Sequence, residues 1–303
     1  MDLFSPILML PVLIAAVIIG WAVQFGRGRV RSLAVDEAAY PGLIRLRSAT
    51  LTARRVGLVL GTISVLAVLP LGYLGRFALT GPAVASMVMI ASILVGQHLV
   101  RRAAQTPGVA GLERRSWSDY PPRRAVFAAA AMLVLVALVA AYTTLAAAPD
   151  DLGRAGRALR TVCSSWFEGT TTEQYTAHMS SPFPGSFYTA PMAVVLGALV
   201  LVAVVALMLV GRRPRNGSDA ELVRVDDALR RITAEGIVAS AGLGVAGSLV
   251  ALAASAYPQF GKAACASANV ASSYLLAIMA LGGLIFSLRC LITVVVPGDG
   301  AQP

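Results

Sequence analysis

The sequence predicts an all-α fold, a polytopic bundle of about seven transmembrane helices that forms one domain over residues 1–303. Three observations support this prediction. Only 13% of the residues are charged, which is about half the share found in soluble domains. The apolar residues, 57% of the chain, occur in long uninterrupted runs rather than in the alternating or 3.6-residue patterns of half-buried surfaces. Arginine-rich segments separate these runs at every second connection.

Seven runs are long enough to be helices that cross a bilayer, because a spanning helix needs about 20 mostly apolar residues. The predicted spans are residues 5–24, 56–75, 82–100, 125–145, 191–211, 232–256 and 270–296. A short connection containing Arg76, Gly81 and Pro82 joins the second run to the third, so these two runs are expected to form a helical hairpin.

The basic residues predict the orientation of the spans. Of the 25 lysines and arginines, 20 lie on one side of the predicted bundle. Cytoplasmic loops collect such residues, so the N-terminus is expected outside and the C-terminus in the cytoplasm of a bacterial cell. In the first run, Asp2 is the only charged residue before the apolar stretch and arginines follow it. This order favours a retained anchor over a cleaved signal peptide.

The net charge of +10 does not indicate a nucleic-acid binder, because most of the positive charge flanks membrane spans. Residues 224–231 are expected to form a short amphipathic helix that continues into the sixth span. The arginines of this inner face are candidate contacts for anionic lipid or for a protein partner. They are Arg212, Arg213, Arg224, Arg230 and Arg231.

The longest outer segment, residues 146–190, is rich in serine, threonine and aromatic residues. It is expected to form an extracytoplasmic cap. Two interpretations stay open, a packed cap that anchors the flanking helices and a surface that faces a ligand or partner.

The three cysteines divide by side. Cys163 and Cys265 both fall in outer segments, and an oxidising exterior favours a disulfide between them. Cys290 falls near the cytoplasmic end of the last span and is expected to be a small buried apolar side chain.

Residues 242–247, Gly-Leu-Gly-Val-Ala-Gly, match the dinucleotide-binding fingerprint letter for letter. The fingerprint requires a preceding strand, whereas these residues fall inside an apolar helix. We therefore expect the glycines to allow close helix packing, as at Gly57, Gly61 and the Gly282-Gly283 pair.

Ionisable residues inside spans are functional candidates, and this chain has few. Glu235 and Arg289 are predicted at similar depth, where an ion pair would clamp the last hairpin. His98 and His178 fall on opposite sides of the membrane, so they cannot share a metal. The sequence also lacks a phosphate-binding Gly-Lys-Ser/Thr loop, a G-x-S-x-G elbow and an H-E-x-x-H helix. No catalytic residue, metal or cofactor is predicted.

In composition and in the segment Val-Asp-Asp-Ala-Leu-Arg-Arg at residues 225–231, the chain resembles uncharacterised multi-pass membrane proteins of actinobacteria. The resemblance implies no activity and no site residues. Two function classes stay open: a non-enzymatic membrane component that binds a partner at its arginine-rich face, and a small-solute permease. The first is favoured, because no acid is predicted at a span midplane; an intramembrane enzyme is the least supported class.

Overall fold

The computed structural model describes residues 41–72, 75–103, 120–166, 173–212, 220–262 and 267–295, so the predicted first span, residues 5–24, lies outside the described part. The elements are α2 (Pro41–Gly72), α3 (Gly81–Ala103), α4 (Arg123–Ala146), β1 (Ala147–Ala148), β2 (Ala158–Trp166), β3 (Glu173–Ser180), α5 (Ser186–Gly211), α6 (Ala220–Lys262) and α7 (Ser267–Val295).

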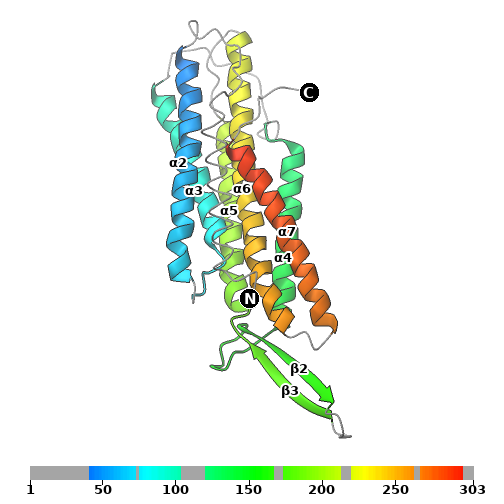
Figure 1. The fold of residues 1–303 in the computed structure, drawn as a ribbon. Helices are drawn as coiled ribbons and strands as arrows, with labels where there is room; N and C mark the ends of the chain where they lie inside the picture. Colours follow the sequence, from blue (N-terminus) through cyan, green and yellow to red (C-terminus); the bar gives the residue numbers. More distant parts are fainter. Residues whose placement is uncertain are drawn as a thin grey trace.

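Six helices of the described chain are long and apolar enough to cross a membrane, which confirms the helical membrane character predicted from the sequence. Their apolar stretches are Ser48–Ala67, Gly81–His98, Arg123–Ala146, Ser186–Gly211, Asp226–Lys262 and Asn269–Val295. Consecutive helices run in opposite directions, so α3, α5 and α7 end where α4 and α6 begin (Figure 1). We call this the arginine-rich end of the bundle, and the other the hairpin end.

The second span differs from its predicted position. Residues 56–75 were predicted, whereas the apolar stretch of α2 covers Ser48–Ala67 and the helix begins at Pro41. Proline is favoured in the first turn of a helix, where no backbone N–H is needed. As a result Arg54 lies within the span, although its charge had suggested a flanking position.

The predicted hairpin of α2 and α3 is confirmed. A turn at residues 75–80 joins the helices, and the Thr80 hydroxyl donates a hydrogen bond of 2.8 Å to the Phe77 carbonyl. The helices approach closely where side chains are small. A Cβ atom added at Gly96 would lie 2.2 Å from the Ala53 Cβ, and one at Gly61 would lie 3.1 Å from the Ala85 carbonyl oxygen.

Helix α6 is the centre of the bundle. It packs against α7, α3, α4, α5 and α2, and 67% of its apolar stretch is buried, compared with 11% for α4. The largest fully buried side chains of the core include Ile90, Ile93, Val136, Leu199, Ile237, Leu249, Leu252 and Leu276. α6 also begins at Ala220, before its apolar stretch, which confirms that residues 224–231 form a helix continuous with the sixth span.

Residues 146–190 contain strands that were not predicted from the sequence. β1, β2 and β3 form an antiparallel sheet in that order, with Leu159 opposite Ala147 and Ser180, and Arg160 opposite Met179. The β2–β3 hairpin extends away from the bundle (Figure 1).

The base of this cap packs onto the helix ends. Phe183 is fully buried and contacts Phe260 edge to face at 5.5 Å, and Phe260 stacks on Tyr142 at 5.7 Å. The Ser180 hydroxyl donates a hydrogen bond to the Gln259 side chain. These contacts with α4 and α6 support the interpretation of residues 146–190 as a packed cap, at least at its base.

Candidate functional site

Arg54 reaches from α2 into the packed core at the arginine-rich end. The residue is only 2% exposed. Its guanidinium donates hydrogen bonds to the Ile232 carbonyl of α6 and, at 3.5 Å, to the Val294 carbonyl of α7. One arginine therefore joins three helices through backbone oxygens.

A glycine makes room for this guanidinium. A Cβ atom added at Gly236 would lie 2.5 Å from Nη2 and 2.9 Å from Cζ of Arg54. Both distances are shorter than a van der Waals contact, so any larger residue at position 236 would displace the arginine.

The half-buried Glu235 interacts electrostatically with Arg54. The sequence had predicted a different ion pair, between Glu235 and Arg289, because the two residues were expected at similar depth in the membrane. The structure shows no ion pair between these two described residues. Arg289 is exposed on α7 and faces α4. Depth along a helix does not specify which face of the helix a residue occupies.

Asp226 and Arg230 form a buried ion pair on α6. The Asp226 Oδ2 atom accepts hydrogen bonds of 2.9 Å from Nε and 2.7 Å from Nη2 of Arg230, and both side chains are 2% exposed. The spacing of four residues, with the acid nearer the helix start, is the favourable order for such a pair. Arg230 also donates to the Gly211 carbonyl of α5 at 3.5 Å and lies over the Tyr120 ring at 5.7 Å.

The burial of Arg230 contradicts the role that was predicted for it from the sequence. It was expected to contact lipid headgroups or a partner, but its charge is already neutralised within the protein. Arg212 is exposed at the end of α5, as expected, and Arg231 is half-buried. Arg213 lies outside the described residues, and Arg224 belongs to α6 but its side chain is not described.

A third polar contact joins α3 to α6 at the same end. The Gln97 amide donates a 2.5 Å hydrogen bond to the Thr233 hydroxyl, which donates in turn to the Leu229 carbonyl at 2.8 Å. Gln97 is 8% exposed and Thr233 is 1% exposed. Buried polar groups of this kind are stable only when partnered, and each has a partner here.

These six residues form what we call the polar layer: Arg54, Gln97, Asp226, Arg230, Thr233 and Glu235. The layer connects α2, α3, α5, α6 and α7 at the arginine-rich end. Its charged groups interact with each other or with backbone carbonyls. Such an arrangement holds helices in a fixed relation, because breaking one contact would leave a charge buried without a partner.

Four site residues were not predicted from the sequence: Arg54, Asp226, Gln97 and Thr233. One signal was available for Arg54: it adjoins the small-residue face of α2 that contains Ala53 and Gly57. The face of α6 that Arg54 contacts contains Gly236, and only the tertiary structure brings the two residues together.

The six-residue glycine motif lies inside α6, which confirms the packing interpretation over the dinucleotide one. Its glycines face different helices. A Cβ at Gly242 would meet the Cys290 sulfur of α7 at 3.0 Å, and one at Gly244 would meet the Ser86 hydroxyl of α3 at 2.6 Å. Among the other predicted packing glycines, Gly282 has no neighbouring atom within 4 Å of an added Cβ, so the prediction is wrong there.

Cys290 is buried, as predicted. Cys163 belongs to β2, but its side chain is not described, and Cys265 lies outside the described residues. The disulfide between them stays a prediction.

His98 lies on α3 near the arginine-rich end and His178 on β3 at the hairpin end, so the two histidines are far apart along the bundle (Figure 1). Within the described ranges, no three His, Cys, Asp or Glu side chains are grouped closely enough to hold a metal ion. No protein-family model, curated protein or solved structure matches this chain.

Proposed function

We propose that this protein is a non-enzymatic component of the bacterial cell membrane, with seven spans, that binds a protein partner through its arginine-rich cytoplasmic face. The first span in this proposal is residues 5–24, which places the N-terminus outside and the C-terminus in the cytoplasm. The location of the basic residues supports this orientation, because the described helices bring the arginine-rich connections to one end of the bundle.

The polar layer is the observation that carries the proposal. A proton- or ion-coupled permease needs ionisable groups that face a path for the substrate and change their charge state during transport. Asp226 and Arg54 are 1% and 2% exposed, and each interacts with neighbouring helices or with its own helix. These contacts favour a rigid framework over a moving gate.

The arginine-rich end of the bundle presents a surface that suits a protein partner. α6 extends from Ala220 through the polar layer as one continuous helix, and the exposed Arg212 and half-buried Arg231 lie beside the layer. Acidic residues such as Asp219 and Glu221 lie between these two arginines in the sequence. A surface of mixed charge supports specific protein recognition in addition to attraction to anionic headgroups.

The orientation is tested by single cysteines and a membrane-impermeant thiol reagent, in a variant that lacks the three native cysteines. Ser218→Cys is expected to react only after the membrane is opened, whereas Thr170→Cys is expected to react in intact cells. Labelling of Ser218→Cys in intact cells would contradict the orientation.

Partner binding is tested by purifying the full chain in a mild detergent and identifying co-purifying proteins by mass spectrometry. Arg212→Glu with Arg231→Glu should release a specific partner. The matched control is Arg160→Glu, which reverses an exposed charge at the hairpin end. Gradient-driven solute uptake by the protein alone in proteoliposomes would overturn the proposal and favour the permease.

A further inference from the structure

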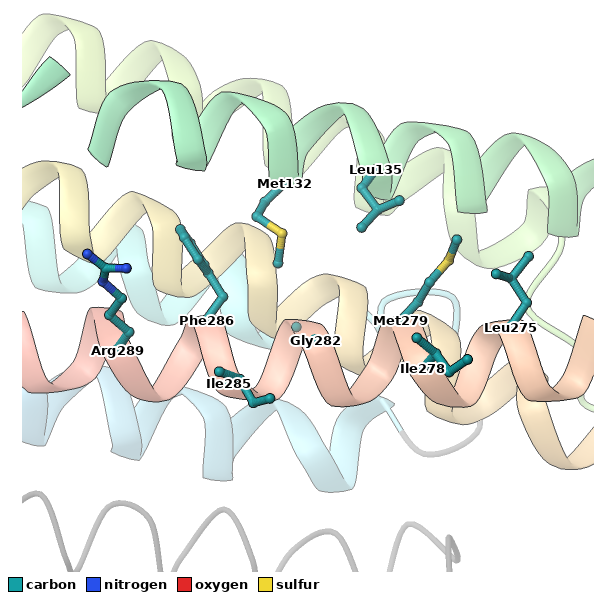
Figure 2. Close-up of a pocket in the computed structure, with 10 residues that line it drawn as sticks. Met132, Leu135, Leu275, Ile278, Met279, Gly282, Ile285, Phe286 and Arg289 are labelled. Atoms are coloured by element: carbon teal, nitrogen blue, oxygen red, sulfur yellow. The ribbon is translucent and has the colours of Figure 1, made fainter. Parts of the chain in front are cut away.

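A narrow groove runs along the bundle surface between α4 and α7. Met132 and Leu135 line it from α4, and Leu275, Gly282, Phe286 and Arg289 line it from α7 (Figure 2). Gly282 opens the groove because an added Cβ there would meet no atom within 4 Å. The groove has a volume of about 490 Å³, which lies within the range of ligand pockets in proteins.

The groove is apolar along its length and positively charged at one end. Arg289 is the only charged lining residue, and Figure 2 shows its side chain at the end of the row, extending from α7 toward α4. Neither α4 nor α7 contains an aspartate or glutamate. In the described part of the chain, Arg289 makes no ion pair. Arg123 and Arg124 are exposed at the start of α4, at this same end of the bundle.

The position of Arg289 matches the headgroup region of one leaflet. It lies six residues before the end of α7 at Val295, or about 9 Å along the helix. An arginine at that depth can extend its guanidinium to the interface. From Leu275 to Arg289 the groove covers fifteen residues of α7, about 21 Å along the helix, which exceeds the roughly 15 Å of hydrocarbon in one leaflet.

The lining favours a phospholipid as the occupant, because it combines an apolar row with a single arginine at one end. A single acyl chain is narrow, and the flexible Met132 side chain can adapt to it. The arginine supplies a partner for the phosphate in the headgroup of a phospholipid.

We propose that the groove between α4 and α7 binds one anionic phospholipid from the arginine-rich leaflet, with an acyl chain between the helices and the phosphate on Arg289. The inference does not depend on the proposed partner, because the groove and the exposed Arg212 belong to different helices. Bound in this way, the lipid would fill the space between two helices that each pack on α6.

The test is native mass spectrometry of the full-length protein in a mild detergent. The protein is titrated with phosphatidylglycerol, and separately with phosphatidylcholine of the same acyl chains. We expect one phosphatidylglycerol to remain bound under conditions that remove phosphatidylcholine. Arg289→Gln should weaken phosphatidylglycerol binding about tenfold or more, because it removes a charge-assisted contact with phosphate.

Gly282→Leu should also abolish retention of this lipid by filling the groove, and Met132→Trp should do the same from the α4 side. Two matched controls should bind like the parent protein: Arg160→Gln, which removes an exposed arginine at the hairpin end, and Gly197→Leu, which fills open space at an exposed glycine of α5. Thermal melting identifies any variant that fails to fold.

Three results would overturn the proposal. Equal retention of the two lipids would exclude recognition of the anionic headgroup. Unchanged binding in both folded groove-filling variants would place the lipid elsewhere. Cross-links from a photoreactive residue at position 282 to residues 5–24, or to a second copy of the chain, would show that a helix occupies the groove.

Discussion

The guanidinium of Arg54 occupies the space that a side chain at Gly236 would need, with Nη2 only 2.5 Å from the position of an added Cβ. Helix α2 thus contributes a charged group to the contact between α6 and α7. This relationship makes one glycine of α6 necessary for the position of an arginine 182 residues earlier in the chain.

Gly236→Ala is therefore expected to lower the thermal stability of the detergent-purified protein, by about 1–3 kcal/mol as in other overpacked cores. Gly197→Ala is the matched control. An added Cβ meets nothing within 4 Å there, so the gain in helix propensity should leave stability unchanged or slightly higher. Equal effects of the two substitutions would show that Arg54 does not lie against Gly236.

Double-mutant cycles should show whether Arg54 or Arg289 is the partner of Glu235. The cycle of Arg54→Met with Glu235→Gln should give a coupling energy of about 0.5–3 kcal/mol, because these two side chains interact. The cycle of Glu235→Gln with Arg289→Gln should be additive within about 0.5 kcal/mol. A large coupling in the second cycle would restore the ion pair expected from the sequence. Thermal or denaturant unfolding in detergent provides the energies.

Removing one partner of the Asp226–Arg230 ion pair should lower stability strongly, whereas replacing both residues with apolar ones should lower it much less. Asp226→Asn leaves a buried arginine without its carboxylate and should destabilise the protein by about 3–5 kcal/mol. Combining Asp226→Leu with Arg230→Met removes both charges and should recover most of that loss, since apolar replacements of buried pairs are often neutral. If the double variant is as unstable as Asp226→Asn, the two charges have some role beyond satisfying each other.

The cap should lose stability in acid through Asp150. Burial alone would raise the pKa of this carboxyl, but hydrogen bonds from the Arg154 and Leu152 backbones, with the side chain and charge of Arg154, hold it below its ordinary value. The Asp150 Oδ2 atom lies 2.8 Å from the Arg154 Nε atom. A lowered folded-state pKa means that the contribution is complete above the unfolded pKa of about 3.9 and is lost as the pH falls below it.

Melting curves between pH 6 and pH 3 check this expectation. The parent protein should lose more stability over that window than Asp150→Asn, whose side chain carries no titrating charge. Asp151→Asn serves as the control because Asp151 is exposed beside it, and this variant should behave like the parent. An identical pH response of all three proteins would mean that Asp150 contributes no acid-sensitive contact.

The predicted disulfide between Cys163 and Cys265 can be tested by thiol labelling. Denatured, non-reduced protein should gain one mass tag, at Cys290, and reduced protein should gain three. Three tags before reduction would show that Cys163 and Cys265 are free.

The sequence alone predicted the helical membrane character of this protein and the approximate positions of five of its six described spans. Those properties depend on the length and polarity of local segments, because lipid requires backbone groups to be satisfied within each helix. The same local reasoning identified the glycines of α6 as packing residues and Cys290 as buried.

The tertiary structure decided which charges meet. Local hydropathy placed Arg54 and Arg230 at the membrane surface, but α2 begins early enough for Arg54 to reach the carbonyls of α6 and α7, and Arg230 turns toward Asp226 and α5. It also decided that residues 146–190 form strands, and that Gly282 faces a groove instead of a helix. Each outcome depends on the rotation of one element against another, which follows from the packing of the whole bundle and has no signature in a single stretch of sequence.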